Sequence, residues 1–497
     1  MIRCRRYLIC FLCLFFTSEG TISAAVEQNF TFDKSVLFGV ATAAYQIEGS
    51  WNESGKGVNV WDYYTHDTNL VSDGSTGDIA CDSYNQYKED VQLLKKLGVD
   101  VYRFSFSWTR ILPTGQVNNI NQEGVDYYNN YINELIANDI KPIVTIYHWD
   151  HPRSLDLLGG WFQPNMVDYM VQYADLLFSL YGDRVKTWIT LNEPHSICVV
   201  LSSYIAGLNP TYPKGTAEYM CGHNMLKAHS EIWHLYKDKY RRKQKGTLGI
   251  ALSLQSYFPA TDTEEDRKAV DKVLITRFGW FAHPVVYGNY PPSMIDTIAR
   301  YSAEQGFPQS RLPRFTWRER SRLAGSYDFI GVNNYISFLV QSLGKEVDKT
   351  PSYENDGGAT VYEDPDWNKN YTQKIQIYAT GFRKILTWVK KNYKNPKIFI
   401  TEQGYANQNS SLNDEDRIYY FQTVLPVLWK AINEDKVKIA GYTVWTLMDD
   451  FEWVSGYKPK MGLYRVDFDD PKRTRTPRDS LGFMTDFYRQ RSLAGLL

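Results

Sequence analysis

Residues 166 to 191 read MVDYMVQYADLLFSLYGDRVKTWITL and contain a helical pattern followed by a strand pattern. Apolar residues recur at spacings of four and three, as they do on the buried face of a helix: Met166, Met170, Tyr173, Leu177 and Leu180. Gly182 closes this pattern, and glycine is common at helix ends. The apolar and β-branched run Thr187–Leu191 then predicts a buried strand.

Runs of the same strand type recur at long intervals in both directions from this unit. Eight of them predict buried strands: Leu37–Ala41, Val101–Ser105, Pro142–Ile146, Thr187–Leu191, Leu248–Leu252, Phe329–Asn333, Ile398–Thr401 and Gly441–Trp445. Helical patterns lie between them, and one of these ends before Gly98: Tyr87, Val91, Leu94 and Leu97. Strands that alternate with helices form a parallel sheet, either open or closed. Because no glycine-rich phosphate loop follows any strand, we predict an α/β protein with a closed (β/α)8 TIM barrel.

The predicted strands belong to one domain. Residues 26–497 contain no Pro/Ser-rich linker, and apolar and aromatic residues run evenly from Phe38 to Phe487. A length near 500 residues is compatible with a single α/β barrel. The charged fraction is 22% with a formal net charge of −1, which excludes the basic excess of a nucleic-acid-binding protein. We therefore expect no nucleic-acid partner.

The first 25 residues have the composition of a cleaved signal peptide. Three arginines lie among the first six residues, an apolar run covers Tyr7–Phe16, and small residues occupy positions 23–25. A membrane anchor is the alternative, but the apolar run is about half of the roughly 20 residues that a spanning helix needs. We predict a secreted, extracellular protein without a membrane anchor.

Cysteines and glycosylation sequons agree with secretion. Removal of residues 1–25 leaves three cysteines, so at most one disulfide forms, and the pairing stays open among Cys81, Cys198 and Cys221. No CxxC or HxxxH spacing accompanies them, and we expect neither a metal nor a cofactor. Four N-x-S/T sequons predict a glycoprotein: Asn29, Asn52, Asn370 and Asn409.

Polar and aromatic side chains follow the predicted strands where each one ends. The carboxyl ends of barrel strands meet on one face, so these groups should converge there. Two glutamates among them, Glu193 after Leu191 and Glu402 after Thr401, match the two carboxyl groups that cleave a glycosidic bond. A structural ion pair is the usual role of an isolated glutamate, but two glutamates with amide and aromatic neighbours favour catalysis. Strands four and seven face each other across the barrel, which allows the separation of about 5 to 5.5 Å seen in retaining enzymes.

Four stretches resemble glycoside hydrolase family 1. They lie in that family's order, and the resemblance covers about residues 36 to 488: Gly39–Gly49 (GVATAAYQIEG), Thr190–Pro194 (TLNEP), Ile400–Gly404 (ITEQG) and Phe451–Trp453 (FEW). The resemblance implies a (β/α)8 barrel and a retaining β-glycosidase. It makes Glu193 the general acid and base and Glu402 the nucleophile.

The same resemblance implies the surrounding site. Arg103, Asn333 and Tyr335 would support the nucleophile, with the cation and the phenol keeping Glu402 ionised. Asn192 would bind the sugar 2-hydroxyl. The remaining substrate-binding residues would be Gln46, His148, Tyr335, Trp445, Glu452 and Trp453.

The sequence departs from the family pattern at five positions. Gln403 and Asp450 stand where asparagine is common, and Met461 replaces a frequent phenylalanine. His151 and Arg153 replace leucine and glutamine. For Arg153 a solvated loop position is preferred, and contact with an anionic aglycone at the pocket mouth is the alternative.

Several functions stay open at this point. A β-glucosidase acting on small β-glucosides comes first, because the acid Glu193 is retained. The alternative is a thioglucosidase (myrosinase) acting on glucosinolates, whose thiolate leaving group scarcely needs an acid. A catalytically inactive glycan-binding relative is disfavoured because both carboxyl groups remain. A transglycosylase differs only in the acceptor, and assembly into a homodimer is possible.

Overall fold

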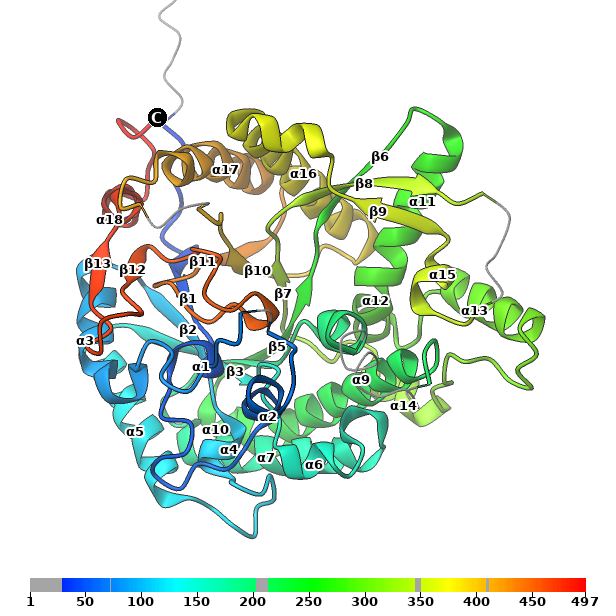
Figure 1. The fold of residues 1–497 in the computed structure, drawn as a ribbon. Coiled ribbons are helices and arrows are strands. Elements are labelled where there is room, and N and C mark those ends of the chain that lie inside the picture. Colours follow the sequence, from blue (N-terminus) through cyan, green and yellow to red (C-terminus); the bar gives the residue numbers. More distant parts are fainter. Residues whose placement is uncertain (1–28, 72, 203–212, 345–349, 408–410) are drawn as a thin grey trace, which may run out of the picture.

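Eight parallel strands close into a barrel at the centre of the molecule (Figure 1). The computed structural model describes residues 29–71, 73–202, 213–344, 350–407 and 411–497. The predicted signal peptide and the sequon at Asn409 lie outside these residues. The barrel order is β1-β11-β10-β7-β5-β4-β3-β2.

The barrel strands coincide with the eight predicted runs and extend some of them by one or two residues. They are β1 (Leu37–Ala41), β2 (Val101–Ser105), β3 (Lys141–Tyr147), β4 (Thr187–Asn192), β5 (Thr247–Ser253), β7 (Phe329–Asn333), β10 (Ile398–Gln403) and β11 (Ile439–Trp445). The predicted fold class, a closed (β/α)8 barrel, is confirmed. Close strand contact depends on glycine at Gly39, where a Cβ would lie 1.9 Å from the carbonyl oxygen of Val101.

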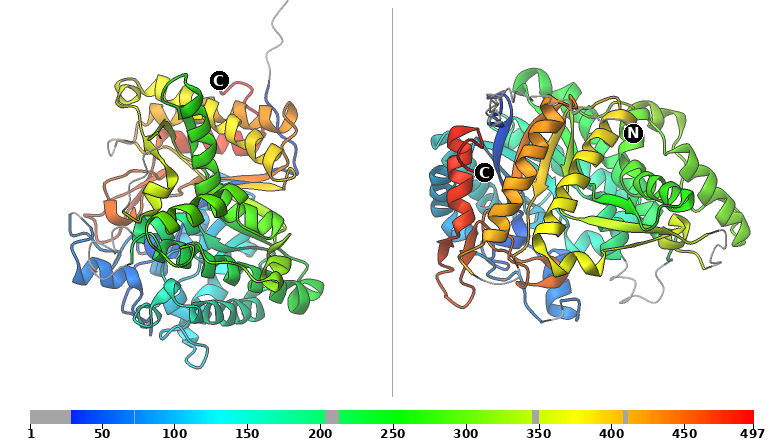
Figure 2. Two further views of the ribbon diagram at one scale, coloured as in Figure 1. Left: turned by 90° about the vertical axis from the view of Figure 1, so that its right-hand side faces the viewer. Right: turned by 90° about the horizontal axis from the view of Figure 1, so that it is seen from above.

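Helices follow the strands and surround the barrel (Figure 2). In the first half these are α1 (Ala44–Ile47), α2 (Val60–Asp67), α3 (Ser83–Leu97), α4 (Trp108–Ile111), α5 (Gln122–Ala137), α6 (Arg153–Asp156), η1 (Gly160–Phe162) and α7 (Asn165–Tyr181). After β4 come η2 (Ser196–Leu201), α9 (Ala217–Leu235), η3 (Tyr236–Tyr240), α10 (Arg241–Gln244), α11 (Glu264–Leu274), η4 (Ile275–Gly279), α12 (Trp280–Tyr287), α13 (Pro292–Glu304) and α14 (Trp317–Leu323). The remainder are α15 (Tyr353–Gly357), η5 (Pro365–Lys369), α16 (Tyr371–Asn392), α17 (Glu415–Asn433), η6 (Trp453–Ser455) and α18 (Asp479–Gln490).

Both predicted helix ends are observed, with different geometry. Gly98 follows α3 in the left-handed conformation (φ 79°), and its N–H bonds to the last turn. Gly182 follows α7 but keeps a right-handed helical conformation (φ −72°). The periodic apolar residues of α7 are buried or partly buried against the barrel.

Two smaller sheets lie outside the barrel. One contains β6 (Ser256–Pro259), β8 (Ser337–Ser342) and β9 (Ala359–Tyr362), and the other pairs β12 (Tyr464–Val466) with β13 (Arg475–Pro477). The first described residues lie beside the C-terminal segment (Figures 1 and 2), where Phe32 N bonds to Arg491 O (2.8 Å). Within the described ranges, no helix combines the length and apolar character that a membrane crossing requires.

The barrel interior changes from apolar to polar along the strands. An apolar layer comes mainly from the first three residues of each strand: Val101, Ile143, Ile189, Ala251, Phe329 and Phe399. Further along, inward side chains are polar, and Arg103 Nε donates to Thr145 Oγ1 (3.1 Å) while its Nη1 donates to Thr401 O (3.0 Å). The apolar layer closes one end, so the polar groups converge at the carboxyl ends of the strands.

Candidate active site

A cavity of about 330 Å³ opens at the carboxyl ends of the barrel strands. Most of the predicted site residues line it. Its walls are His148, Trp149, Asn192, Glu193, Tyr335, Ile336, Lys374, Tyr378, Glu402, Gly404, Tyr405, Ala406, Trp445, Glu452, Trp453, Pro459 and Met461. Strands β4 and β10, which are distant in sequence, therefore bring Glu193 and Glu402 to one cavity.

Glu402 is the penultimate residue of β10, and both of its carboxylate oxygens are hydrogen-bonded. Arg103 Nη1 donates to Oε1 (2.5 Å), and the Tyr335 hydroxyl donates to Oε2 (2.6 Å). Burial and the Glu402 charge raise the pKa of Tyr335 well above its ordinary value, so the phenol keeps its proton. A buried cation and a neutral donor together stabilise negative charge on Glu402.

Glu193 lies directly after β4 in the opposite electrostatic setting. Burial first, and then the charge of Glu402, raise the pKa of Glu193 to about 7. Hydrogen bonds from Ser196 and Asn333 and the Arg103 charge oppose this rise. The Glu193 backbone is left-handed (φ 43°), a conformation that costs a non-glycine residue about 1–3 kcal/mol and is enriched at functional sites.

Amide side chains connect the two glutamates. Arg103 Nη2 and Asn333 Nδ2 both donate to Asn192 Oδ1, at 2.7 and 3.1 Å. Asn333 Nδ2 also lies 2.8 Å from Glu193 Oε1, and Asn333 Oδ1 accepts from the Thr401 hydroxyl (2.5 Å). Asn333 therefore donates to Glu193, whereas the family resemblance led us to expect that it supports Glu402.

Aromatic rings and a neutral histidine form one wall of the cavity. The His148 ring stacks on Trp445 and Trp453, with centroids 5.9 and 6.0 Å apart. Burial lowers the pKa of His148 well below its ordinary value, so its ring is uncharged. Asn192 Nδ2 donates to His148 Nε2 (3.1 Å), and Trp445 Nε1 donates to Glu452 Oε1 (3.0 Å).

Gln46 and Asp450 lie behind the lining. Gln46 Nε2 donates to Phe451 O (2.9 Å), and the buried Gln46 Oε1 has no protein partner among the described residues. Asp450 is buried beside Glu452; burial first, and then the Glu452 charge, raise its pKa well above its ordinary value. Burial also raises the pKa of Glu452. Both shifts favour the neutral carboxyl form over the charged one.

His151 and Arg153, two of the departures from the family pattern, are not among the residues that line the cavity. The Arg153 guanidinium pairs with Asp156 and lies 3.6 Å from the centroid of the Tyr63 ring. His151 is buried, with Nδ1 at 3.0 Å from the Tyr147 hydroxyl. These contacts favour the structural interpretation of Arg153 over the aglycone contact. Of the other departures, Met461 lines the cavity and Gln403 Nε2 donates to Asn334 Oδ1 (3.2 Å).

Sequence reasoning missed the cavity residues that α16 contributes. Lys374 and Tyr378 lie one turn apart near the start of this helix and line the cavity. Lys374 Nζ pairs with Glu363 (2.6 Å), which also accepts from the Tyr378 hydroxyl (2.9 Å). Nothing in the local sequence marks these two positions, because the long helix reaches the cavity only through the tertiary fold.

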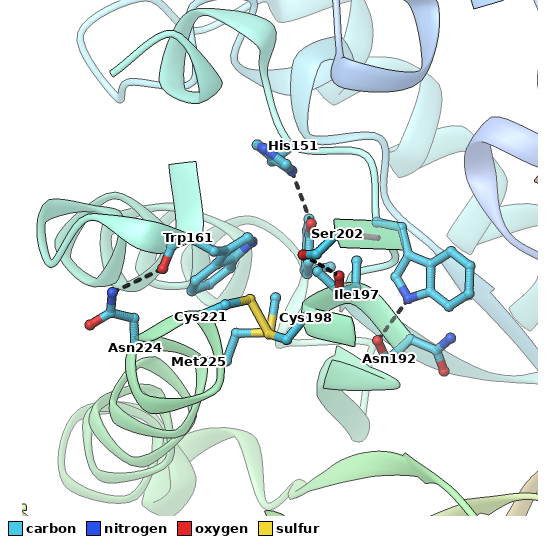
Figure 3. Close-up of a disulfide and its surroundings, with 11 residues drawn as sticks. His151, Trp161, Asn192, Ile197, Cys198, Ser202, Cys221, Asn224 and Met225 are labelled. Atoms are coloured by element: carbon cyan, nitrogen blue, oxygen red, sulfur yellow. Dashed lines mark hydrogen bonds between the residues drawn. A yellow bond between two sulfur atoms is a disulfide. The ribbon is translucent and has the colours of Figure 1, made fainter. Parts of the chain in front are cut away.

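The disulfide anchors the segment that follows Glu193. Cys198 in η2 is bonded to Cys221 in α9, while Cys81 is a buried free thiol. Figure 3 shows the bridge beside Trp161, whose backbone oxygen accepts from Asn224 Nδ2 (2.9 Å). The open pairing is thereby resolved as Cys198–Cys221.

The described sequons are exposed. Asn29, Asn52 and Asn370 all lie at the surface. Asn370 also caps α16, because its Oδ1 accepts from the backbone N–H of Thr372 and Gln373. Three predicted sites are thus accessible for glycosylation.

Comparison with known proteins identifies the family. A family model described as "Glycosyl hydrolase family 1" matches residues 28–493. "Myrosinase 1" of Brevicoryne brassicae is 44% identical over 91% of this chain and 97% of its own length. The "Cytosolic beta-glucosidase" of Cavia porcellus is 39% identical over 90% and 96%, respectively. The solved structure "Aphid myrosinase" has a TM-score of 0.86 and 41% identity, covering 93% of this chain and 99% of that one. The chain belongs to glycosyl hydrolase family 1 and is a glycoside hydrolase.

Proposed function

We propose that this protein is a secreted retaining β-glycosidase that hydrolyses small β-glucosides. The observation that carries the proposal is that two glutamates in one cavity lie in different electrostatic environments. Burial and a neighbouring charge raise the pKa of Glu193 to about 7, whereas Arg103 and Tyr335 both donate to Glu402. An acid and a nucleophile are thereby separated by environment.

In the first step, a Glu402 oxygen forms a bond to the anomeric carbon while the glycosidic bond breaks. Glu193 transfers its proton to the departing oxygen, so the aglycone leaves as a neutral alcohol. The sugar is then esterified to Glu402, and Glu193 is left as a carboxylate. The negative charge of the nucleophile disappears at this stage, which makes the ionised form of Glu193 less costly.

In the second step, the Glu193 carboxylate takes a proton from a water molecule. The water oxygen attacks the anomeric carbon and breaks the ester bond. Free sugar leaves, Glu402 regains its charge, and Glu193 regains its proton. Two inversions at the anomeric carbon leave the β configuration unchanged.

Polar groups and aromatic faces hold the sugar between the two glutamates. Asn192, His148 and Glu452 line the cavity, and we assign hydroxyl binding to them. Gln46 Oε1 has no protein partner among the described residues and is suited to accept from a hydroxyl. Trp445 and Trp453 present apolar ring faces to the sugar.

Thioglucoside hydrolysis is the second candidate. It is supported by the 44% identity to a myrosinase and by the cation Lys374 in the cavity lining, which would have to exchange Glu363 for a sulfated aglycone. We prefer O-glycosides as substrates because the acid Glu193 is retained, and a thiolate leaving group scarcely needs an acid.

One substrate panel separates the candidates. We would measure kcat/KM for aryl glucosides, alkyl glucosides and one glucosinolate, and determine the first-formed anomer by NMR. β-Glucose from the O-glucosides, with higher kcat/KM than the glucosinolate, supports the first proposal. A higher kcat/KM for the glucosinolate supports thioglucoside hydrolysis. In that case Lys374→Met should lower kcat/KM selectively for the glucosinolate, and the control Lys369→Met should not. Lys369 is an exposed lysine nearby that pairs with Asp366.

Secretion and domain organisation belong to the same proposal. Residues 1–25 are cleaved, residues 26–497 form one barrel domain, and the exposed sequons carry glycans. N-terminal sequencing of protein recovered from the medium of a eukaryotic host should begin near residue 26. Recovery inside the cells with an intact N-terminus would contradict secretion.

A further inference from the structure

The two oxygens of Glu193 accept hydrogen bonds from donors of different kinds. Asn333 Nδ2 donates to Oε1 (2.8 Å), and the Ser196 hydroxyl donates to Oε2 (2.6 Å). An amide nitrogen has hydrogens only, whereas a hydroxyl both donates and accepts. The two sides of the carboxyl group therefore respond differently to protonation.

The hydrogen bonds favour Oε2 as the oxygen that carries the proton. The Asn333 N–H occupies one of the two lone pairs of Oε1, and a proton at that position would point at a nitrogen that has no lone pair to receive it. Oε1 is therefore the better carbonyl oxygen, and Oε2 is the better site for the proton. There the Ser196 hydroxyl can rotate, accepting from the protonated acid and donating to the carboxylate.

We propose that Ser196 is a positioning residue of the acid/base: its hydroxyl directs the proton to Oε2 of Glu193 and reverses its hydrogen bond when that proton leaves. The inference rests on the proposed role of Glu193. In the substrate complex the Oε2–H bond turns from Ser196 to the glycosidic oxygen and passes its proton to it, and the hydroxyl of Ser196 turns to donate to the developing carboxylate. When the carboxylate later takes a proton from water, the hydroxyl turns back.

The local fold holds Ser196 in reach of Glu193. Ser196 begins η2 only three residues after Glu193, and Cys198 in the same segment is bonded to Cys221 of α9. The Ser202 hydroxyl at the other end donates to Ile197 O (3.1 Å), as Figure 3 shows. Ser202 lies in the same segment and its hydroxyl is used by the backbone, so it is a matched control.

The direction of the effect follows from the hydrogen bond. Ser196 bonds to both forms of Glu193, but its bond to the charged carboxylate is the stronger one, so it lowers the pKa of Glu193 against the larger effects of burial and Glu402. Removal of the hydroxyl should raise that pKa. The ionisable groups around Glu193 on all neighbouring elements are Glu402, Glu452, Arg103, His148, His195, Tyr335, Lys374, Tyr378 and Tyr405. Since these groups are the same in each serine variant, the comparison reports the hydroxyl.

The test is the alkaline limb of the pH profile of kcat/KM for an alkyl β-glucoside, which requires a protonated acid. Ser196→Ala should move the midpoint of this limb upward by about one pH unit, the size expected for one hydrogen bond to a charged group. Ser196→Thr, which keeps the hydroxyl, and Ser202→Ala should retain the wild-type midpoint. A fluoroglucoside that traps the covalent intermediate counts the competent sites, so incomplete folding does not alter the comparison.

Two results would overturn the inference. One is an unchanged midpoint in Ser196→Ala, even if activity falls equally at every pH, because that describes a structural role. The other is the same shift in threonine and alanine variants, because the hydroxyl is then irrelevant. Glu193→Gln separates this from the proposed function: if the limb persists without Glu193, the acid itself is misassigned.

Discussion

Replacement of Glu193 by glutamine should make the protein more stable at alkaline pH while it removes the acid. The substitution keeps the shape of the side chain and deletes its ionisation. Asn333 can still donate to the amide oxygen, and the Ser196 hydroxyl can accept from the amide nitrogen. The change in folding free energy therefore arises mainly from the removal of one ionisable group.

The magnitude follows from the raised pKa. The Glu193 carboxyl titrates near 4.5 in the unfolded chain and at about 7 in the folded protein. The native state binds the extra proton between these values, so wild-type stability falls as the pH rises through this window and falls no further above it. The Glu193→Gln variant does not lose this stability, because its amide does not ionise. The free energy of unfolding of Glu193→Gln relative to wild type should rise by roughly 2 to 3 kcal/mol between pH 5 and pH 8.

The assay is unfolding of both proteins at pH 5 and pH 8, with Glu304→Gln as the control. Glu304 is a half-exposed surface glutamate that pairs with Arg300, so its variant reports an amide substitution at a solvent-exposed site. In parallel, Glu193→Gln should slow alkyl glucosides far more than aryl glucosides with good leaving groups. An equal stability difference at both pH values, or equal slowing of all leaving groups during glycosylation, would refute the assignment of Glu193 as a buried acid.

Two further predictions concern the disulfide and Arg153. The double variant Cys198→Ser/Cys221→Ser should lose about 3 kcal/mol of stability, because a bridge over 23 residues restricts the unfolded chain. Denaturant unfolding of the oxidised wild type and of the variant measures this difference, and equal stabilities would contradict it. Arg153→Ala should leave KM unchanged for a sulfated thioglucoside and a neutral aryl glucoside alike, because its guanidinium is occupied by Asp156 and Tyr63; a rise on the sulfated substrate alone would place Arg153 in the site.

The barrel could be predicted because each strand carries its own local signal. The run Gly441–Trp445 is apolar and β-branched, and it lies within β11 as observed. The small sheet of β6, β8 and β9 was not predicted, because strands such as Ser256–Pro259 are short and lack such a run. The position of Glu193 at a strand end was predictable, whereas its left-handed backbone depends on the packing around it.

The part of the site that the barrel strands build could be predicted better than the part that α16 builds. Arg103 lies within β2, and Asn192 and Glu402 lie at or next to the ends of β4 and β10, so barrel geometry alone brings them together. Lys374 and Tyr378 lie on a helix that reaches the cavity only in the folded chain. The sequence does not reveal both partners of Asn333: β7 pairs with β10 beside Glu402, and the side-chain nitrogen donates to Glu193 after β4.

The most direct test of the account is the anomer formed by Glu402→Ala in the presence of azide. We expect no turnover by this variant without azide, because the covalent intermediate has no other nucleophile to form on. Azide should restore part of the rate on an activated aryl β-glucoside and yield the α-glycosyl azide. Hydrolysis at the wild-type rate by Glu402→Ala, in a sample free of contaminating enzyme, or a β-glycosyl azide as the rescued product, would contradict the assignment of Glu402 as the nucleophile.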